Sequence, residues 1–341
     1  MKRNEETAAI LRGMRAALRL QRELGLDKGD HRRRRIDVFG CINRCGATLM
    51  FQPLDPLLGA FIKEGMATGI LLSTRRPLGQ QRFTAAHELG HLRLEHDPHA
   101  DDESILRRGP IAGGNGFPKT TREEREADAF ASYFLLPDWL IKEQMALHGW
   151  TKTAFATPEI VYQASLRFGT SYSGTIYGLE REKAIDHRVR QKLLMVQPSA
   201  LKRALLPDYA LKTTRSVDVW HLTEHDEGAV IEAGRDDLFL LRLREDSGAG
   251  YVWTFDELQA AGFAILKDGR EPVSAGRIGA PTIRRVLARS ERTSSVTYSL
   301  RERRPWAPDE EPRALTLHYS TSTSDQCGLF RPQLDELLAA T

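Results

Sequence analysis

Three histidines and two glutamates stand in the otherwise apolar stretch QRFTAAHELGHLRLEH, residues 81–96. Residues four apart lie on one face of a helix, so His87 and His91 can point at the same spot, with Glu88 at the edge of that face. Two neutral imidazoles suit Zn²⁺, which lowers the pKa of its bound water to about 7. A neighbouring carboxylate can take the proton of that water. The HExxH spacing therefore predicts a hydrolytic zinc site.

The alternative is a chance match on a polar helix face. Phe83 and Leu89 favour a buried helix, where imidazoles need partners, and so favour the metal. Leu94 and Asp97 occupy the places where a metzincin carries glycine and a third histidine. The third ligand must therefore come from elsewhere in the chain.

A second segment, TREEREADAFASYFLLP (121–137), also mixes acidic and apolar residues at helical spacing and ends at a proline. Glu124 and Asp128 share a stripe with small alanines, which would let this helix approach the first one closely. We expect Glu124 to bind the metal and Asp128 to accept the free N–H of a ligand histidine. Glu126 is the weaker candidate ligand, because it points about 200° away from Glu124, and is expected to be a solvated helix charge.

RFTAAHELGH, followed by EREAD and FASYFLLP, resembles the ImmA/IrrE group of bacterial zinc metallopeptidases over about residues 36–180. The resemblance implies the zinc ligands His87, His91 and Glu124, with Glu88 as the catalytic base. Asp128 departs from the asparagine that is usual in the group. Peptidases of this group are known for cleaving helix-turn-helix repressors after stress or phage signals. The resemblance thus implies a repressor encoded nearby as the substrate, in stress or phage-defence regulation.

The elements that must position these residues are indicated by the flanking sequence. Residues 4–26 predict an amphipathic helix, and residues 36–45 predict a second helix that ends at Gly46. Short strands are expected at about 48–53, 60–64 and 69–73. We therefore expect an α+β zincin-like domain in which a small twisted sheet covers the HExxH helix.

Residues 157–180 resemble a helix-turn-helix with Phe168 and Gly169 at the turn. The second helix offers little that could read DNA, so we expect this helical pair to pack beneath the zinc site. Three tyrosines are candidates for stabilising an oxyanion, and the sequence does not choose among Tyr162, Tyr172 and Tyr177.

The whole chain of 341 residues suggests two domains, which we place at 1–200 and 215–341. No run of 18 apolar residues predicts a membrane span, and the charged N-terminus differs from a signal peptide. Three cysteines, an odd number, fit a reducing cytoplasm. Cys41 and Cys45 are expected to be small buried hydrophobes, although a thiolate of Cys327 or Cys41 that caps the zinc is an alternative.

The net charge of +3 does not by itself indicate nucleic acid, but the charge is unevenly distributed. Arg32, Arg33, Arg34 and Arg35 form a run that is usually a solvated helix start or linker. Such a run would also attract an anionic effector without reading its sequence. Single-stranded nucleic acid is therefore a candidate activator.

Beyond about residue 215, short alternating strands separated by turn residues predict an antiparallel β-sandwich of the immunoglobulin-like type. The expected strands are LFLLRLRE (238–245), YVWTF (251–255), GFAILK (262–267), SSVTYSLRE (294–302) and RALTLHYST (313–321).

Three loops of this half, SGAGYVW (247–253), GRIG (276–279) and RRPW (303–306), carry a second resemblance. In order and spacing they are similar to the loops of chagasin-type inhibitors of papain-like cysteine peptidases, over about residues 217–322. The resemblance implies loops that form a wedge at one end of the sandwich. The first loop departs from the family, because EDSGAG replaces an asparagine-proline-threonine-threonine run.

Arg304 and Trp306 are the candidate partner-binding residues of these loops, because arginine and tryptophan dominate binding hot spots. Tyr251 and Trp253 could face either the core or a partner.

The expected function is a zinc endopeptidase with a regulatory or substrate-docking β-sandwich. One alternative is a non-catalytic binding or protease-inhibitor protein that acts through the chagasin-like half. Another is a nucleic-acid-binding regulator, whose affinity for DNA would fall steeply with salt.

Overall fold

The computed structural model describes residues 3–29, 34–54, 57–64, 67–97, 99–101, 121–211, 217–234, 236–273, 279–292, 295–307 and 313–322. These residues form two compact units, one from most of the residues up to Val196 and the other mainly from Gln197 onward. Each unit is described by itself.

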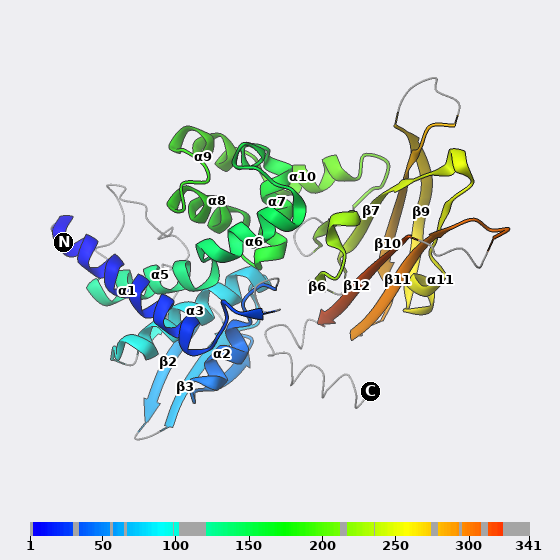
Figure 1. Ribbon diagram of the computed structural model, residues 1–341. Coiled ribbons are helices and arrows are strands. Elements are labelled where there is room, and N and C mark those ends of the chain that lie inside the picture. The colour runs from blue at the N-terminus through cyan, green and yellow to red at the C-terminus, as the bar shows by residue number, and fades with distance from the viewer. Residues whose placement is uncertain are drawn as a thin grey trace. The chain divides into compact units, whose positions relative to one another are not determined.

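The first unit is mainly helical, with one small sheet (Figure 1). Its helices are α1 (Arg3–Glu23), α2 (Val38–Arg44), α3 (Leu78–Leu94), α5 (Arg122–Leu135), α6 (Asp138–His148), α7 (Pro158–Phe168), α8 (Tyr172–Arg181) and α9 (His187–Leu194). Its strands are β1 (Thr48–Gln52), β2 (Gly59–Glu64), β3 (Ala67–Ser73) and β4 (His99–Asp101). The helices predicted near residues 4–26 and 36–45 are α1 and α2, and the three predicted strands are β1, β2 and β3.

The sheet has the order β1-β3-β2-β4, in which β1 runs parallel to β3 and the other pairs are antiparallel. One face of the sheet and one face of α3 share a buried core. Phe61, Ile70 and Leu72 of the sheet lie in the same hydrophobic cluster as Ala85 and Leu89 of α3. The expected arrangement of a small sheet on the HExxH helix is therefore confirmed.

Two glycines allow the helices of this unit to pack at backbone distance. A methyl group at Gly90 of α3 would lie 3.1 Å from Phe130 Cβ and 3.2 Å from Ala127 Cα of α5. A methyl group at Gly13 of α1 would collide with the carbonyl oxygen of Glu126 on α5. The three helices can therefore approach one another only because these positions lack a Cβ atom.

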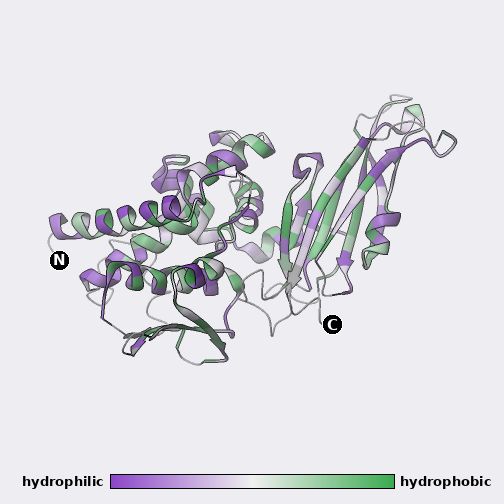
Figure 2. Cartoon of the chain, turned by 60° about the horizontal axis from the view of Figure 1, so that its bottom comes forward, coloured by the Kyte–Doolittle hydropathy of each residue, from purple (hydrophilic) through white to green (hydrophobic). Residues whose placement is uncertain are grey.

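The second unit is a sandwich of two four-stranded sheets with two short helices. The helices are α10 (Pro198–Leu205) and α11 (Asp256–Ala260). The strands are β5 (Val219–Leu222), β6 (Val230–Gly234), β7 (Leu238–Glu245), β8 (Val252–Thr254), β9 (Phe263–Pro272), β10 (Thr282–Ser290), β11 (Ser295–Arg303) and β12 (Arg313–Ser322). One sheet has the order β5-β7-β10-β9 and the other β6-β12-β11-β8. Hydrophobic and hydrophilic residues alternate along the strands (Figure 2), as a sandwich core requires.

The predicted β-sandwich is present, but the expectation that its strands would pair antiparallel was wrong for two pairs. Strand β5 pairs in parallel with β7, and β6 pairs in parallel with β12. Strand β6 lies between β5 and β7 in the chain but belongs to the other sheet, so β7 is reached by a crossover rather than a hairpin.

The central strand β10 was not predicted, because TIRRVLARS carries three arginines where a sheet interior usually shows apolar residues. Two of those side chains are matched by carboxylates. Arg284 pairs with Asp268, and Arg285 lies 3.0 Å from Asp208.

Among the described residues, no helix is long and apolar enough to cross a membrane.

Candidate metal centre

The HExxH residues lie in the second half of α3, where the helix is enclosed. His87, Glu88 and His91 are each at most 1% exposed. The helix ends at Glu95, whose left-handed backbone (φ 58°) turns the chain back so that the next residue, His96, is also buried. Burying a leucine side chain at these positions would carry no desolvation cost, whereas burying an imidazole or a carboxylate does. The buried imidazoles and carboxylate therefore indicate a role beyond packing.

Helix α5 brings a second carboxylate to the same place. Thr121 caps the helix by accepting a hydrogen bond from the Glu124 backbone N–H at 3.2 Å. Ala127 and Ala131 are fully buried at the contact with α3. Because α5 can approach Gly90 so closely, a glutamate side chain on its first turns reaches the two histidines.

Three side chains converge on one point between α3 and α5. His87 Nε2 and His91 Nε2 lie 3.0 Å apart, and the Glu124 carboxylate lies 3.5 Å from His87 Nε2 and 3.7 Å from His91 Nε2. One ligand atom of each residue falls within 4.8 Å of the other two. Two imidazole nitrogens and one carboxylate oxygen match the donor set of a catalytic zinc ion. Glu124 is 15% exposed, so this side of the cluster is open to solvent.

The outward nitrogen of His87 lies close to an acid. Its Nδ1 is 3.0 Å from Asp128 Oδ1, one turn beyond Glu124 on α5. A carboxylate at this position would fix the ring so that Nε2 faces the metal and would raise the basicity of the ligand.

His91 is held differently, through a second histidine. His91 Nδ1 lies 3.0 Å from His96 Nδ1, and His96 Nε2 lies 3.1 Å from Glu126 Oε2. If His91 binds a metal through Nε2 as a neutral ring, its Nδ1–H must donate, so His96 accepts through Nδ1 and donates through Nε2–H to Glu126. These contacts are therefore consistent with one assignment of the protons to the ring nitrogens of His91 and His96.

Glu126 is the anchor of this chain of contacts, and the expectation that it would be solvated was wrong. Its side chain is fully buried, and it accepts from Arg122 Nε at 2.7 Å and from Arg12. Burial acts to raise the pKa of Glu126, but the hydrogen bonds from Arg122 and His96 and the charge of Arg12 outweigh it and lower that pKa. His96 was not singled out from the sequence; its signal was a third histidine just beyond the helix end.

The side chain of Glu88, on α3, lies against strand β2. A methyl group at Gly59 of β2 would lie 3.0 Å from Glu88 Oε1 and 2.6 Å from Thr84 Cγ2. The backbone of β2 therefore passes directly over this carboxylate, which a side chain at position 59 would displace.

The cysteines of the first unit do not belong to the cluster. Cys41 is buried in the hydrophobic core, and burial raises the pKa of its thiol to about 12. Cys45 also has a raised pKa because it is partly buried. Among the described residues, the ligand atoms that gather within 4.8 Å of one another are those of His87, His91 and Glu124, so capping of a metal by Cys41 is not supported. Cys327 lies outside the described residues.

The predicted helical pair is α7 and α8, joined at Gly169 with φ 65°. Two residues that a DNA reader would present, Tyr172 and Thr175, are buried. The Tyr172 hydroxyl donates to the Leu193 carbonyl, and Tyr162 is buried as well. Of the three candidate tyrosines, Tyr177 lines a pocket.

The arginine run is only partly described. Arg34 is exposed, whereas Arg35 is half-buried and its side chain packs near Gly169. Arg32 and Arg33 lie outside the described residues.

The predicted partner-binding loops of the second unit converge at one end of the sandwich. Arg304 stacks over the Tyr251 ring at 4.5 Å and donates to the Ala249 carbonyl at 3.0 Å. Trp306 packs over Gly250 yet remains 71% exposed. Trp253, by contrast, is 4% exposed and faces the core. Trp306 thus presents a large aromatic surface on a loop that Arg304 holds in place. Of the GRIG loop, residues 276–278 lie outside the described residues.

The model of the IrrE N-terminal-like domain, Peptidase family M78, matches residues 46–178. A curated relative matches about a third of the chain. Amoebiasin-2 of Entamoeba histolytica is 31% identical over 112 residues, which are 32% of this chain and 90% of that protein.

Two solved structures also match about a third of the chain. The cysteine protease inhibitor EhICP2 from Entamoeba histolytica is 26% identical, covers 31% of this chain and 97% of its own, and has a TM-score of 0.28. PbICP-C, solved in complex with falcipain-2, is 9% identical, covers 33% of this chain and 95% of its own, and has a TM-score of 0.20. The sequence similarity to amoebiasin-2, rather than these superpositions, supports the family assignment.

The contacts of His96 predict that Glu126 supports metal binding without being a ligand. Glu126→Ala should weaken the affinity for Zn²⁺ about tenfold, because His96 would lose the acceptor that orients it toward His91. Glu123→Ala, on the exposed face of the same helix, is the matched control. Competition with a metal-sensitive chelator dye measures both affinities. Equal affinities in the two variants would contradict the supporting role.

Proposed function

Because residues 46–178 belong to the IrrE N-terminal-like family and the C-terminal region belongs to the chagasin-like family of the Entamoeba inhibitors, we propose that this protein is a zinc-dependent endopeptidase with an attached protein-binding domain. The observation that carries the proposal is the group of His87, His91 and Glu124, whose ligand atoms all lie within 4.8 Å of one another.

In the proposed mechanism, the residues of the chain divide into holding and proton-transferring groups. His87, His91 and Glu124 would hold the zinc, which when bound supplies a water of lowered pKa. Asp128 and the His96–Glu126 pair would keep the two imidazoles in their ligating orientation. Glu88 would take a proton from water and deliver it to the leaving amide nitrogen, the role of a general base and then a general acid.

The proposed substrate is a helix-turn-helix transcriptional repressor, cut in bacterial stress or phage-defence regulation. This proposal rests on the resemblance of RFTAAHELGH and its partner helix to the ImmA/IrrE group. We place the activity in the cytoplasm, in keeping with the unpaired thiols of Cys41 and Cys45.

Cleavage and metal content test the roles separately. Glu88→Gln should retain zinc as the wild type does but lose roughly 100-fold or more in cleavage of a repressor encoded beside the gene, because general base catalysis is removed. His87→Ala, His91→Ala and Glu124→Ala should each lose or strongly weaken zinc.

Elemental analysis after dialysis measures the metal, and gel electrophoresis of the repressor measures cleavage. Full activity of Glu88→Gln would contradict the mechanism. Zinc that persists in Glu124→Ala and vanishes in Glu126→Ala would contradict the choice of ligand.

The exposed Trp306 favours a second candidate function, the binding of a papain-like cysteine peptidase at the end loops of the sandwich. The chagasin-like relatives support this candidate, as does the clustering of Arg304, Tyr251 and Trp306. The first loop weighs against a deep wedge. It forms a short 3-10 turn over Ser247–Ala249, and Asp246 before it is paired with Arg313.

Inhibition of papain at micromolar concentrations of the protein tests this second function. Trp306→Ala should weaken inhibition at least tenfold, because a central aromatic contact would be lost. Arg292→Ala is the control, since this exposed arginine follows β10 in the turn that leads into the opposite end of β11. A lack of inhibition by the wild type would dismiss the inhibitory function.

Single-stranded nucleic acid remains a proposed activator, supported by the charge of Arg32, Arg33, Arg34 and Arg35. Repressor cleavage should accelerate with added oligonucleotide at low salt and less so at high salt, because phosphate contacts release counterions. Replacing the four arginines with serine should reduce the acceleration while leaving zinc content unchanged. Identical rates with and without oligonucleotide at low salt would exclude this activator.

A further inference from the structure

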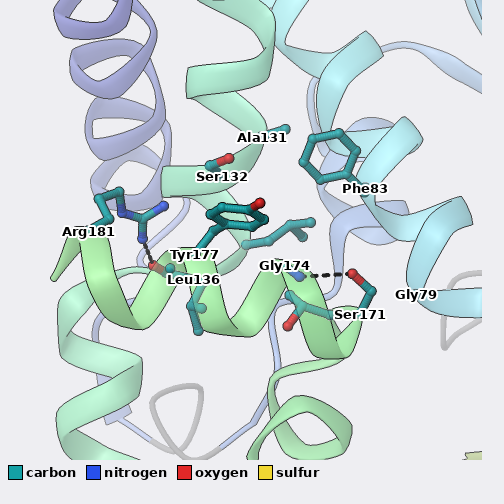
Figure 3. Close-up of a pocket in the computed structure, with 12 residues that line it drawn as sticks. Gly79, Phe83, Ala131, Ser132, Leu136, Ser171, Gly174, Tyr177 and Arg181 are labelled. Atoms are coloured by element: carbon teal, nitrogen blue, oxygen red, sulfur yellow. Dashed lines mark hydrogen bonds between the residues drawn. The ribbon is translucent and has the colours of Figure 1, made fainter. Parts of the chain in front are cut away.

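A pocket opens between α3, α5 and α8. Figure 3 shows the rings of Phe83 and Tyr177 facing the same space, with Ala131 and Ser132 above Tyr177 in this view. Leu135 and Leu136 of the α5 end complete the apolar wall. Each of these residues belongs to the first unit, so the pocket is formed within one compact body.

The lining favours an apolar occupant over an anion. The one guanidinium at the pocket, that of Arg181, is engaged by the protein itself: it donates to the Leu136 carbonyl, donates to Glu182 Oε1 at 2.7 Å and lies 4.1 Å from the Tyr133 ring centre. Its side chain is only 6% exposed. An anionic ligand would therefore have to break existing contacts.

One polar atom of the wall is unsatisfied. The Ser132 hydroxyl oxygen is buried and has no hydrogen-bond partner within the part of the chain that the structure describes. Such a group usually has a partner, and an apolar side chain in the pocket could not supply one, so a backbone group of the ligand would have to meet this hydroxyl.

The pocket continues the candidate metal centre along the α3–α5 interface. Phe83 lies one turn before His87 on α3, with the two ring centres 6.5 Å apart. Ala131 follows Asp128 by three residues, and so lies on the same side of α5. Along this interface, the metal cluster is followed by the His87–Asp128 contact, and that contact is followed by the pocket.

We propose that this pocket is the subsite that receives a bulky apolar side chain, such as leucine, methionine or phenylalanine, of the residue next to the scissile bond. The proposal rests on the proposed peptidase function. Consecutive residues of an extended peptide advance by about 3.3–3.6 Å, so a side chain beside a bond held at the metal can span one helical turn. The pocket then selects substrates by the size and polarity of that residue.

A pair of zinc-binding probes tests this assignment without relying on catalysis. Leucine hydroxamate and glycine hydroxamate share the metal-binding group and differ in the side chain that would enter the pocket. Titration calorimetry on the zinc-loaded full chain should show leucine hydroxamate binding at least about tenfold tighter, because burying several methylene groups favours it.

A variant that fills the pocket gives the second arm. Gly174 lines the pocket, and a Cβ atom there would meet only the Ser171 hydroxyl, at 3.0 Å. Gly174→Leu should therefore occupy the space while favouring the helical state of α8, since glycine is a poor helix former. Ser173→Leu, exposed on the same helix, is the matched control.

The preference for leucine hydroxamate should fall toward equality in Gly174→Leu and persist in Ser173→Leu. Equal affinities for the two probes in the wild type, or a preference unchanged by Gly174→Leu, would overturn the subsite while leaving the peptidase proposal standing. If neither probe binds the zinc-loaded protein, the peptidase proposal falls and the subsite falls with it.

Discussion

The first unit depends on keeping two imidazoles buried four residues apart on one helix. A polar group buried without a partner costs roughly 2–7 kcal/mol, so each ring needs neighbours on both sides. His87 has Asp128 at 3.0 Å, and His91 has His96 at 3.0 Å. These neighbours can be supplied only if α5 packs against α3, and α1 against α5, at backbone distance, which Gly90 and Gly13 allow. The packing of three helices and the geometry of the cluster are therefore one constraint.

The second unit also uses buried carboxylates to set a surface. Glu245, fully buried, accepts from the Trp253 backbone N–H at 3.0 Å and pairs with Arg270. Glu302, 1% exposed, accepts from the Asp246 backbone N–H at 2.7 Å, and burial raises its pKa. These two acids fix both ends of the loop on which Arg304 and Trp306 rest. In both units, buried carboxylates that accept several hydrogen bonds thus hold the neighbouring side chains and loops in place.

Spacing along a helix is the information that a single sequence carries best. It was enough to select His87, His91 and Glu124 and to place Asp128 behind them, because these residues lie three or four positions apart on regular helices. The contact between His96 and Glu126 was not predicted, because it depends on the left-handed turn at Glu95 and on the approach of α1, neither of which has a local signature. In the sandwich, β10 was missed because two of its arginines pair with acids distant in sequence, and the parallel pairs were missed because strand order is a property of the whole fold.

The central claim is that one metal ion is held by two histidines of α3 and one glutamate of α5. Anomalous diffraction at the zinc absorption edge, on crystals of the zinc-loaded protein, tests this claim most directly. The expected map has its strongest peak about 2.0–2.2 Å from His87 Nε2, His91 Nε2 and a carboxylate oxygen of Glu124. A peak on His96 and Glu126 instead, or none at the His87–His91 cluster in crystals that contain zinc, would contradict it.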